Sequence, residues 1–241
     1  MRVGVVITMY DESEIVLRTI NEIKKHFIDS EIVLVHSDNQ EDSETLNTIN
    51  QHLSEYIKLP DMANEIVLEN VNPILIRNFN NGFSKLYELQ NEYDLVIGLT
   101  GDTLISDASS FFRRQEEMKK NKWIAMVSQA VGQYFHATAS DGSRIVEGRY
   151  QSGGTTDFAS CIFFLDGKWA SEHQAFSNIE MTNIWTNEQC LGDEIIKHLG
   201  DSNFHDSVGR LNSKNPTVAY SYNDGVMYHA KHNGKPAGRH S

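Results

Sequence analysis

Short runs of β-branched and aliphatic residues alternate, over the first hundred residues, with longer stretches in which apolar residues recur at helical spacing. Val16, Ile20, Ile23 and Phe27 form one such stripe, which predicts a helix with one buried face. Similar stripes predict helices over 44–59 and 80–92. The apolar runs predict buried strands at 3–8, 31–36, 65–68, 74–76 and 95–99. This alternation is typical of an α/β fold with a mainly parallel central sheet flanked by helices.

The second part of the chain is less regular. Helices are predicted over 108–120 and 187–199, and a hairpin over 134–150. Further strands are predicted at 122–129, 159–165, 217–222 and 226–230. Residues 231–241 form a tail rich in glycine, proline and basic residues. A length of 241 residues predicts one domain spanning 1–241, and the chain shows no internal repeat.

Composition narrows the class of protein. Of the residues, 22% are charged and 39% hydrophobic, which is ordinary for a globular domain. A net charge of −12 argues against a general nucleic-acid binder, which needs excess Lys and Arg. The two cysteines are too few for a disulfide framework, so a reducing, cytoplasmic location is expected. No run approaches the ~20 apolar residues that span a membrane.

Polar clusters follow three of the predicted parallel strands: Tyr10-Asp11-Glu12, Ser37-Asp38-Asn39 and Thr100-Gly101-Asp102. The carboxyl ends of parallel strands meet at one edge of a sheet, where ligands bind. Asp102 is therefore a candidate ligand of a metal or phosphate, although an aspartate here could equally cap a turn. No GxGxxG or GxxxxGK[ST] sequence is present, which excludes the dinucleotide-binding and P-loop motifs.

The order of four segments resembles the GT-A class of nucleotide-sugar glycosyltransferases, nearest to glycosyltransferase family 2. The segments are VVITMYDES, VLVHSDN, NNGFSKLYELQNEYDLVIGLTGDT and GDEIIKHL. In that family, a first strand ends in Tyr-Asn-Glu and a second in Asp-Asp, and an Asn-x-Gly helix precedes an Asp-x-Asp strand. A Glu-Asp pair follows on a later helix. The resemblance covers about residues 3–200 and implies a GT-A fold, with a donor half at 1–106 and an acceptor half at 107–230.

The resemblance also implies a donor site. Tyr10 and Glu12 fall where the family contacts the nucleoside, and Asp38 where it binds the nucleobase, usually uracil. Asp102 matches the last Asp of Asp-x-Asp, which binds the divalent cation on the donor diphosphate. Thr100 stands in place of the first Asp, which leaves the metal dependence open. The remaining residues assigned to the donor site are Thr8, Asn81, Gly82 and Gly101, with Asn81 and Gly82 at the start of a helix beside the nucleotide.

A second metal ligand and a cationic segment come later in the chain. Many GT-A enzymes supply a late histidine to the metal, and His229 resembles it; a structural histidine is the alternative. Asp102 and His229 together suit Mn²⁺ or Mg²⁺. Lys231 and Lys235 could fold over a diphosphate, or belong to a solvated tail.

Asp193 and Glu194 are candidates for the catalytic base, because transfer to a hydroxyl needs a carboxylate that removes its proton. Aligning Ile196 with the family's core leucine makes Asp193 the base, whereas aligning the acidic pair directly makes Glu194 the base. An acidic first turn of a helix is the structural alternative.

The expected function is transfer of a sugar, with inversion, from a nucleoside diphosphate donor, most simply UDP-linked, to a hydroxyl group. The acceptor is expected to be a glycan, a lipid-linked molecule or another hydroxyl compound. The alternatives are a retaining transferase and a sugar-nucleotide-binding module with weak catalysis. Homo-oligomerisation is left open.

Overall fold

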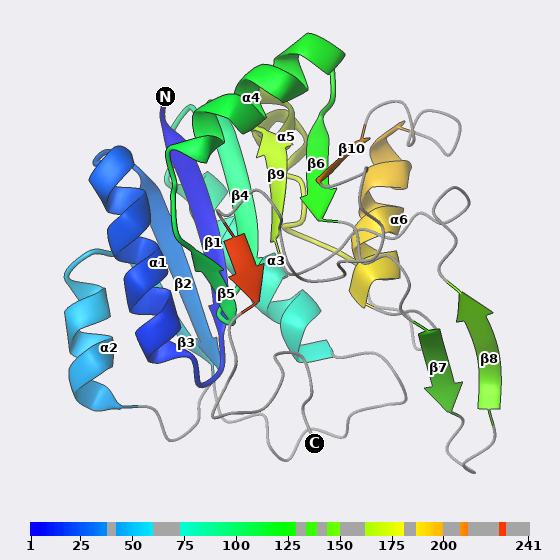
Figure 1. Ribbon diagram of the computed structural model, residues 1–241, viewed down its shortest axis with the longest axis horizontal. Coiled ribbons are helices and arrows are strands. Elements are labelled where there is room, and N and C mark those ends of the chain that lie inside the picture. The colour runs from blue at the N-terminus through cyan, green and yellow to red at the C-terminus, as the bar shows by residue number, and fades with distance from the viewer. Residues whose placement is uncertain are drawn as a thin grey trace.

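A computed structural model describes residues 1–37, 42–59, 73–128, 134–138, 144–149, 162–180, 187–199, 208–211 and 227–229. The strands of its main sheet are β1 (Val3–Met9), β2 (Glu31–Ser37), β3 (Glu55–Leu59), β4 (Leu95–Thr100), β6 (Ala125–Ser128), β9 (Ile162–Asp166) and β10 (Val208–Leu211). Within the described residues these seven strands have the order β10-β6-β9-β4-β1-β2-β3. Only β9 runs antiparallel to its neighbours, β4 and β6. The prediction of a mainly parallel α/β sheet is confirmed (Figure 1).

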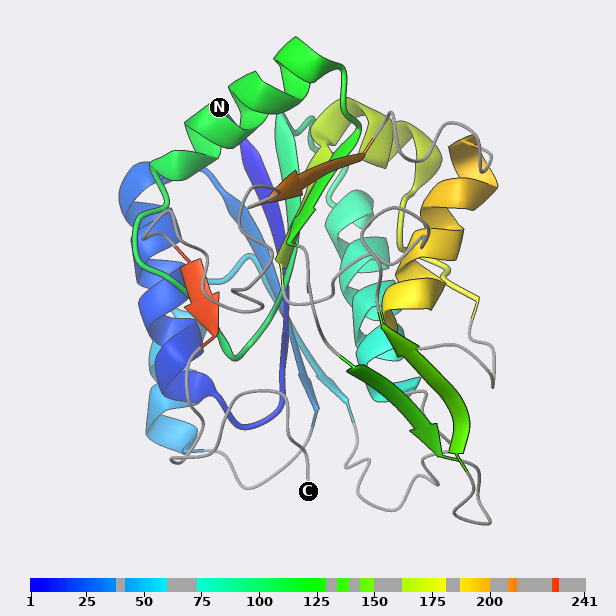
Figure 2. The same cartoon turned by 45° about the vertical axis from the view of Figure 1, so that its right-hand side comes forward.

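Helices cover both faces of this sheet (Figure 2). The helices are α1 (Ser13–His26), α2 (Ser43–Asn50), α3 (Pro73–Glu88), α4 (Ser110–Asn121), α5 (Gly167–His173) and α6 (Asn187–Leu199). One buried cluster joins α1, α2 and α4 to the sheet, and a second joins α3, α5 and α6 to the other face. Val5 and Ile7 of β1 belong to the first cluster and Val6 to the second, which explains why this central strand is apolar throughout.

Two smaller strand pairs lie outside the main sheet. β5 (Thr103–Ile105) pairs antiparallel with β11 (Met227–His229), and β7 (Tyr134–Thr138) pairs with β8 (Arg144–Arg149). The second pair confirms the predicted hairpin. Within the described part of the chain, no helix combines the length and apolar character needed to cross a bilayer.

The structure corrects three predicted elements. The helix predicted over 44–59 ends at Asn50, and 55–59 forms β3, because its residues pair in parallel with β2. The strand predicted at 74–76 is helical, and the helix predicted to begin at residue 80 begins at Pro73. Proline suits the first position of a helix, where its missing N–H leaves no bond unmade. The strands predicted at 65–68 and 217–222 lie outside the described residues.

Gly82 therefore lies inside α3 rather than at its start. A Cβ at this position would lie 2.4 Å from Cγ1 of Val6 and 3.0 Å from Cγ2 of Val35. Glycine is required because the helix backbone approaches β1 and β2 this closely. The Asn-Asn-Gly sequence marks a helix-to-sheet contact, and not the turn that it suggests in the sequence.

Candidate functional site

The end of β1 lies between the ends of β2 and β4. Thr8 is in register with Thr100 on β4 and with Val35 on β2. The chain then turns at Tyr10, which is 37% exposed, and enters α1. Three of the residues assigned to the donor site, Thr8, Tyr10 and Thr100, are thus brought to one edge of the sheet, as the parallel order of strands requires.

Glu12 fixes the turn after β1. Its Oε2 accepts hydrogen bonds from the backbone N–H groups of Tyr10 at 2.9 Å and Asp11 at 3.1 Å. Burial raises the pKa of Glu12 from 4.5 to about 7, and the charge of nearby Asp102 acts in the same direction, against the two N–H donors. Glu12 is therefore a buried carboxyl that holds the turn and titrates near neutral pH.

Asp102 lies in the tight connection from β4 to β5. The N–H of Gly101 donates to the carbonyl of Thr8 at 2.6 Å, and a Cβ on Gly101 would lie 2.8 Å from Oε2 of Glu12. A side chain at position 101 would therefore displace the carboxylate of Glu12. Oδ1 of Asp102 accepts a hydrogen bond of 2.5 Å from the hydroxyl of Thr100. The connection between the strands thus sets Asp102 beside the turn that follows β1.

β5 carries the chain away from Asp102 and along α1. The hydroxyl of Thr19 on α1 donates to the carbonyl of Thr103 at 3.1 Å and accepts from the N–H of Ile105 at 3.2 Å. β11 pairs with the other side of β5, and His229 is in register with Thr103. Residues directly opposite in an antiparallel pair have Cα atoms about 5 Å apart. The backbone of His229 therefore lies beside the residue that follows Asp102, which the sequence could indicate only through the family resemblance.

Asn78 on α3 is a polar residue at this edge that sequence reasoning missed. Its Nδ2 donates to Oγ of Ser37, the last residue of β2, at 2.9 Å. Its Oδ1 is buried and has no hydrogen-bond partner among the described residues. No signal for it was available in the sequence, because residue 78 lies between the strand predicted at 74–76 and the helix predicted over 80–92. Asn81 and Gly82 lie further along α3, whereas Asp38, Lys231 and Lys235 lie outside the described residues.

The two carboxylates of α6 differ in their surroundings. Asp193 is exposed, whereas the residue Glu194 is 6% exposed. Oε1 of Glu194 lies 3.3 Å from Nε2 of His198, and its Oε2 lies 3.7 Å from Nζ of Lys197. Glu194 is therefore buried and held by contacts within its own helix, whereas Asp193 is open to solvent.

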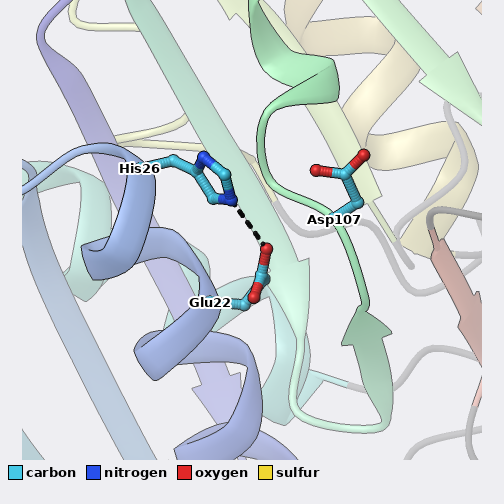
Figure 3. A group of neighbouring side chains, drawn as sticks. All are labelled: Glu22, His26 and Asp107. Carbon is cyan, nitrogen blue, oxygen red and sulfur yellow. Dashed lines mark ion pairs between the residues drawn. The ribbon is translucent and has the colours of Figure 1, made fainter.

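Glu22, His26 and Asp107 form a group of potential metal ligands within the described residues (Figure 3). One donor atom from each lies within 4.8 Å of the others, and Nε2 of His26 lies 3.0 Å from Oε1 of Glu22. Oε1 of Glu22 also accepts the N–H of Ala108 at 3.3 Å. A helix rises about 1.5 Å per residue, so His26 lies about 20 Å along α1 from its beginning beside Asp102. This group is therefore separate from the edge of the sheet at which Thr8, Tyr10 and Thr100 lie, called the donor edge below after the role proposed for it.

No protein-family model matches the chain, and no curated protein matches its sequence. Solved structures match its fold. Staphylococcus aureus TarS 1–349 matches with a TM-score of 0.52 and 11% identity over 89% of this chain and 59% of that chain. Its complex with UDP matches with a TM-score of 0.50, with the same identity and coverage. Full TarS matches with a TM-score of 0.51 over 96% of this chain and 37% of that chain.

These likenesses show that the chain has a GT-A-like glycosyltransferase fold. The expectation of this fold from the order of motifs is confirmed. The chain spans 59% of the length of TarS 1–349, so the likeness does not extend to the remainder of TarS 1–349.

Proposed function

We propose that this protein is a glycosyltransferase that moves a sugar from a nucleoside diphosphate donor, most simply a UDP-sugar, to a hydroxyl acceptor. The observation that carries the proposal is the register of His229 with Thr103, the residue after Asp102. This register sets the backbone of His229 beside the residue that follows Asp102, which supports a site shared by a carboxylate and a late histidine from separate parts of the chain. The complex of TarS with UDP, on the same fold, supports the choice of nucleotide.

Asp102 and His229 are the residues proposed to hold a divalent cation, Mn²⁺ or Mg²⁺. Carboxylate and imidazole ligands suit these ions when substrate oxygens complete the set. When bound, the cation would neutralise charge on the departing nucleoside diphosphate. Thr100 provides a hydroxyl where a second carboxylate is usual, and its bond to Oδ1 of Asp102 fixes the remaining carboxylate. The donor set is therefore one carboxylate and one imidazole.

On the donor side, Tyr10 and Glu12 are proposed to shape the nucleoside pocket, with Asp38 at the nucleobase and Thr8, Gly101 and Asn81 nearby. Gly82 lets α3 approach β1 and β2. Lys231 and Lys235 are proposed to cover the diphosphate. Residues 1–106 then form the donor half and residues 107–230 the acceptor half of one domain.

Asp193 is proposed to remove the proton from the acceptor hydroxyl as that oxygen attacks the anomeric carbon. The bond from the anomeric carbon to the diphosphate breaks on the opposite side, which inverts the configuration. Proton transfer by a positioned carboxylate contributes typically about 10² to 10⁴ in rate. The exposure of Asp193 and the internal contacts of Glu194 support this choice.

The test begins with binding. Thermal unfolding is measured with UDP, GDP and a panel of their sugars, with and without Mn²⁺, because a ligand that binds the native state raises the unfolding temperature. A metal-dependent shift, followed by release of free nucleotide from the same donor, is the expected result. A sugar-nucleotide-binding module, which the single carboxylate of the Thr100-Gly101-Asp102 turn favours, would show the shift without release. Absence of a shift with every nucleotide would overturn the proposal.

A further inference from the structure

α3 carries three polar side chains on one face, at positions 80, 84 and 87. All three bond to the backbone of a short segment about ninety residues later. The hydroxyl of Tyr87 donates to the carbonyl of Ala175 at 2.9 Å, and that of Ser84 to the carbonyl of Ser177 at 3.1 Å. This face of α3 therefore holds the segment 175–179 by its main chain.

Asn80 makes the third contact, and it differs from the other two in being reciprocal. Its Nδ2 donates to the carbonyl of Ile179 at 3.1 Å, and its Oδ1 accepts from the N–H of Ile179 at 2.7 Å. One carboxamide thus satisfies both main-chain groups of one residue, which fixes the orientation of that peptide backbone as well as its position. Ser84 and Tyr87 each hold a single carbonyl.

Ile179 is buried in the same cluster as residues of α6. Its side chain is 3% exposed and belongs to the same buried cluster as Cys190, Leu191 and Ile195 of α6. α6 carries Asp193 and begins soon after Ile179 in the chain. The residue held by Asn80 is therefore buried in the cluster in which α3 packs against α6, the helix that carries the proposed base.

The opposite side of α3 is fixed to the donor half of the sheet. Asn78 bonds to Ser37 at the end of β2, and Gly82 lies against Val6 and Val35. Residues 78 and 80 differ by about 200° around a helix, so they point to opposite sides. α3 is thus a rigid element between the donor edge and the segment that precedes α6.

We propose that Asn80 is a positioning residue that sets α6, and with it Asp193, relative to the donor edge. The role of Asp193 in this proposal rests on the proposed function. The link from Asn80 to α6 is independent of that function. Asn80 would act on turnover rather than on donor affinity, because a displacement of about 1 Å at a reacting group can lower the rate about 10²-fold.

Hydrogen exchange tests the link without any activity. In Asn80→Ala, the amide of Ile179 and those of α6 are expected to exchange about tenfold faster or more, while β1, β2 and β4 keep their protection. Ser84→Ala is the matched control, since it removes one bond to the same segment, and it should leave α6 unchanged. Asn80→Asp keeps an acceptor for the N–H of Ile179 and should give an intermediate rate. Unchanged exchange in α6 of Asn80→Ala would overturn the proposal, as would equal acceleration in the Ser84→Ala control.

Kinetics test the consequence, with the sugar nucleotide found active in the panel as donor. Asn80→Ala is expected to lower kcat about tenfold or more and to leave the KM for donor and the Kd for UDP with Mn²⁺ unchanged. Wild-type kcat in Asn80→Ala, or a change confined to donor KM, would overturn the proposal. If the wild-type protein turns over no donor, the proposed function fails, and hydrogen exchange still decides the role of Asn80.

Discussion

The hydroxyl of Thr100 donates a hydrogen bond to Oδ1 of Asp102 at 2.5 Å, across the single residue Gly101. Thr100, which stands in place of the first aspartate of the Asp-x-Asp pattern, is thus bonded directly to Asp102, which matches the second aspartate. Thr100 is also in register with Thr8 on β1, so the bond lies where the parallel strands β1 and β4 end.

Thr100→Val tests this bond, because valine keeps the shape and β-branching of threonine and removes the hydroxyl. A hydrogen bond to a charged group contributes about 1.5 to 3 kcal/mol, so nucleotide binding in the presence of Mn²⁺ is expected to weaken about tenfold or more. Titration calorimetry with UDP and Mn²⁺ measures the effect. Thr45→Val, which removes a hydroxyl bonded to Asp42 on the surface, is the control. Unchanged affinity in Thr100→Val would show that the bond does not orient Asp102.

The proposed metal site can be tested by replacing His229, with His26 as the matched control. His229→Ala is expected to abolish the Mn²⁺-dependent part of nucleotide binding, because Asp102 would then be the single proposed protein ligand. His26→Ala is expected to leave it unchanged, because His26 lies at the far end of α1. Thermal shift with UDP, with and without Mn²⁺, distinguishes the two. Loss of the Mn²⁺ effect in His26→Ala alone would move the metal to Glu22, His26 and Asp107.

The two carboxylates of α6 should separate catalysis from stability. Asp193→Asn is expected to lower transfer about 10²-fold or more and to leave the unfolding free energy unchanged, since Asp193 is exposed. Glu194→Gln is expected to lower the unfolding free energy by about 1 to 3 kcal/mol, because it disturbs a buried group paired with His198 and Lys197, and to keep measurable transfer. Urea unfolding and a transfer assay on both variants measure these effects. Full transfer by Asp193→Asn would assign the base to Glu194.

Glu12 predicts a pH dependence of stability. Its pKa is about 7 in the folded protein against 4.5 in the unfolded chain, and burial is the main cause. A group whose pKa is raised by folding stabilises the native state below the unfolded pKa, and this contribution is lost as the pH rises through the folded pKa. Glu12→Gln should therefore be more stable than the wild type at pH 8, by up to about 3 kcal/mol, and show little gain at pH 4.

Urea unfolding at both pH values, with a chelator present, measures this difference. Glu14→Gln is the control, because Glu14 is an exposed carboxylate in the first turn of the same helix. A gain in Glu12→Gln that is equal at both pH values would contradict the assignment of the effect to this carboxyl.

Gly82→Ala tests the contact between α3 and the sheet. Alanine is the better helix former by about 1 kcal/mol, but its Cβ would lie 2.4 Å from Cγ1 of Val6. Overpacking of a core costs about 1 to 3 kcal/mol, so a net loss of stability is expected. Combining Gly82→Ala with Val6→Ala should lose less than the sum of the single changes, measured by thermal unfolding. A stabilised Gly82→Ala protein would show that α3 can move away from β1.

The sequence was sufficient to predict the helices and strands in which one hydrophobic periodicity dominates. Val16, Ile20, Ile23 and Phe27 all face the core, as their spacing indicates. Residues 55–59 were misassigned because Tyr56 continues a helical stripe, and their pairing with β2 depends on residues distant in sequence. The same holds for 74–76, where a short apolar run fits a strand or a buried helix equally well.

The candidate site was predictable where it depends on strand order. The meeting of Thr8, Thr100 and Asp102 follows from parallel pairing. The pairing of Asn80 with Ile179 and the internal contacts of Glu194 could not be predicted, because each depends on how α3 and α6 lie after folding.

The pairing of β11 with β5 joins residues more than a hundred positions apart, and this has a consequence for synthesis on the ribosome. β1, β2, β3 and β4 all lie within the first hundred residues and can pair as soon as these emerge. Closing a long loop carries an entropic penalty, and β5 gains β11 only after residues 227–229 have been translated. A nascent chain with a folded sheet would thus remain unable to complete the proposed metal-binding pair until synthesis is well advanced.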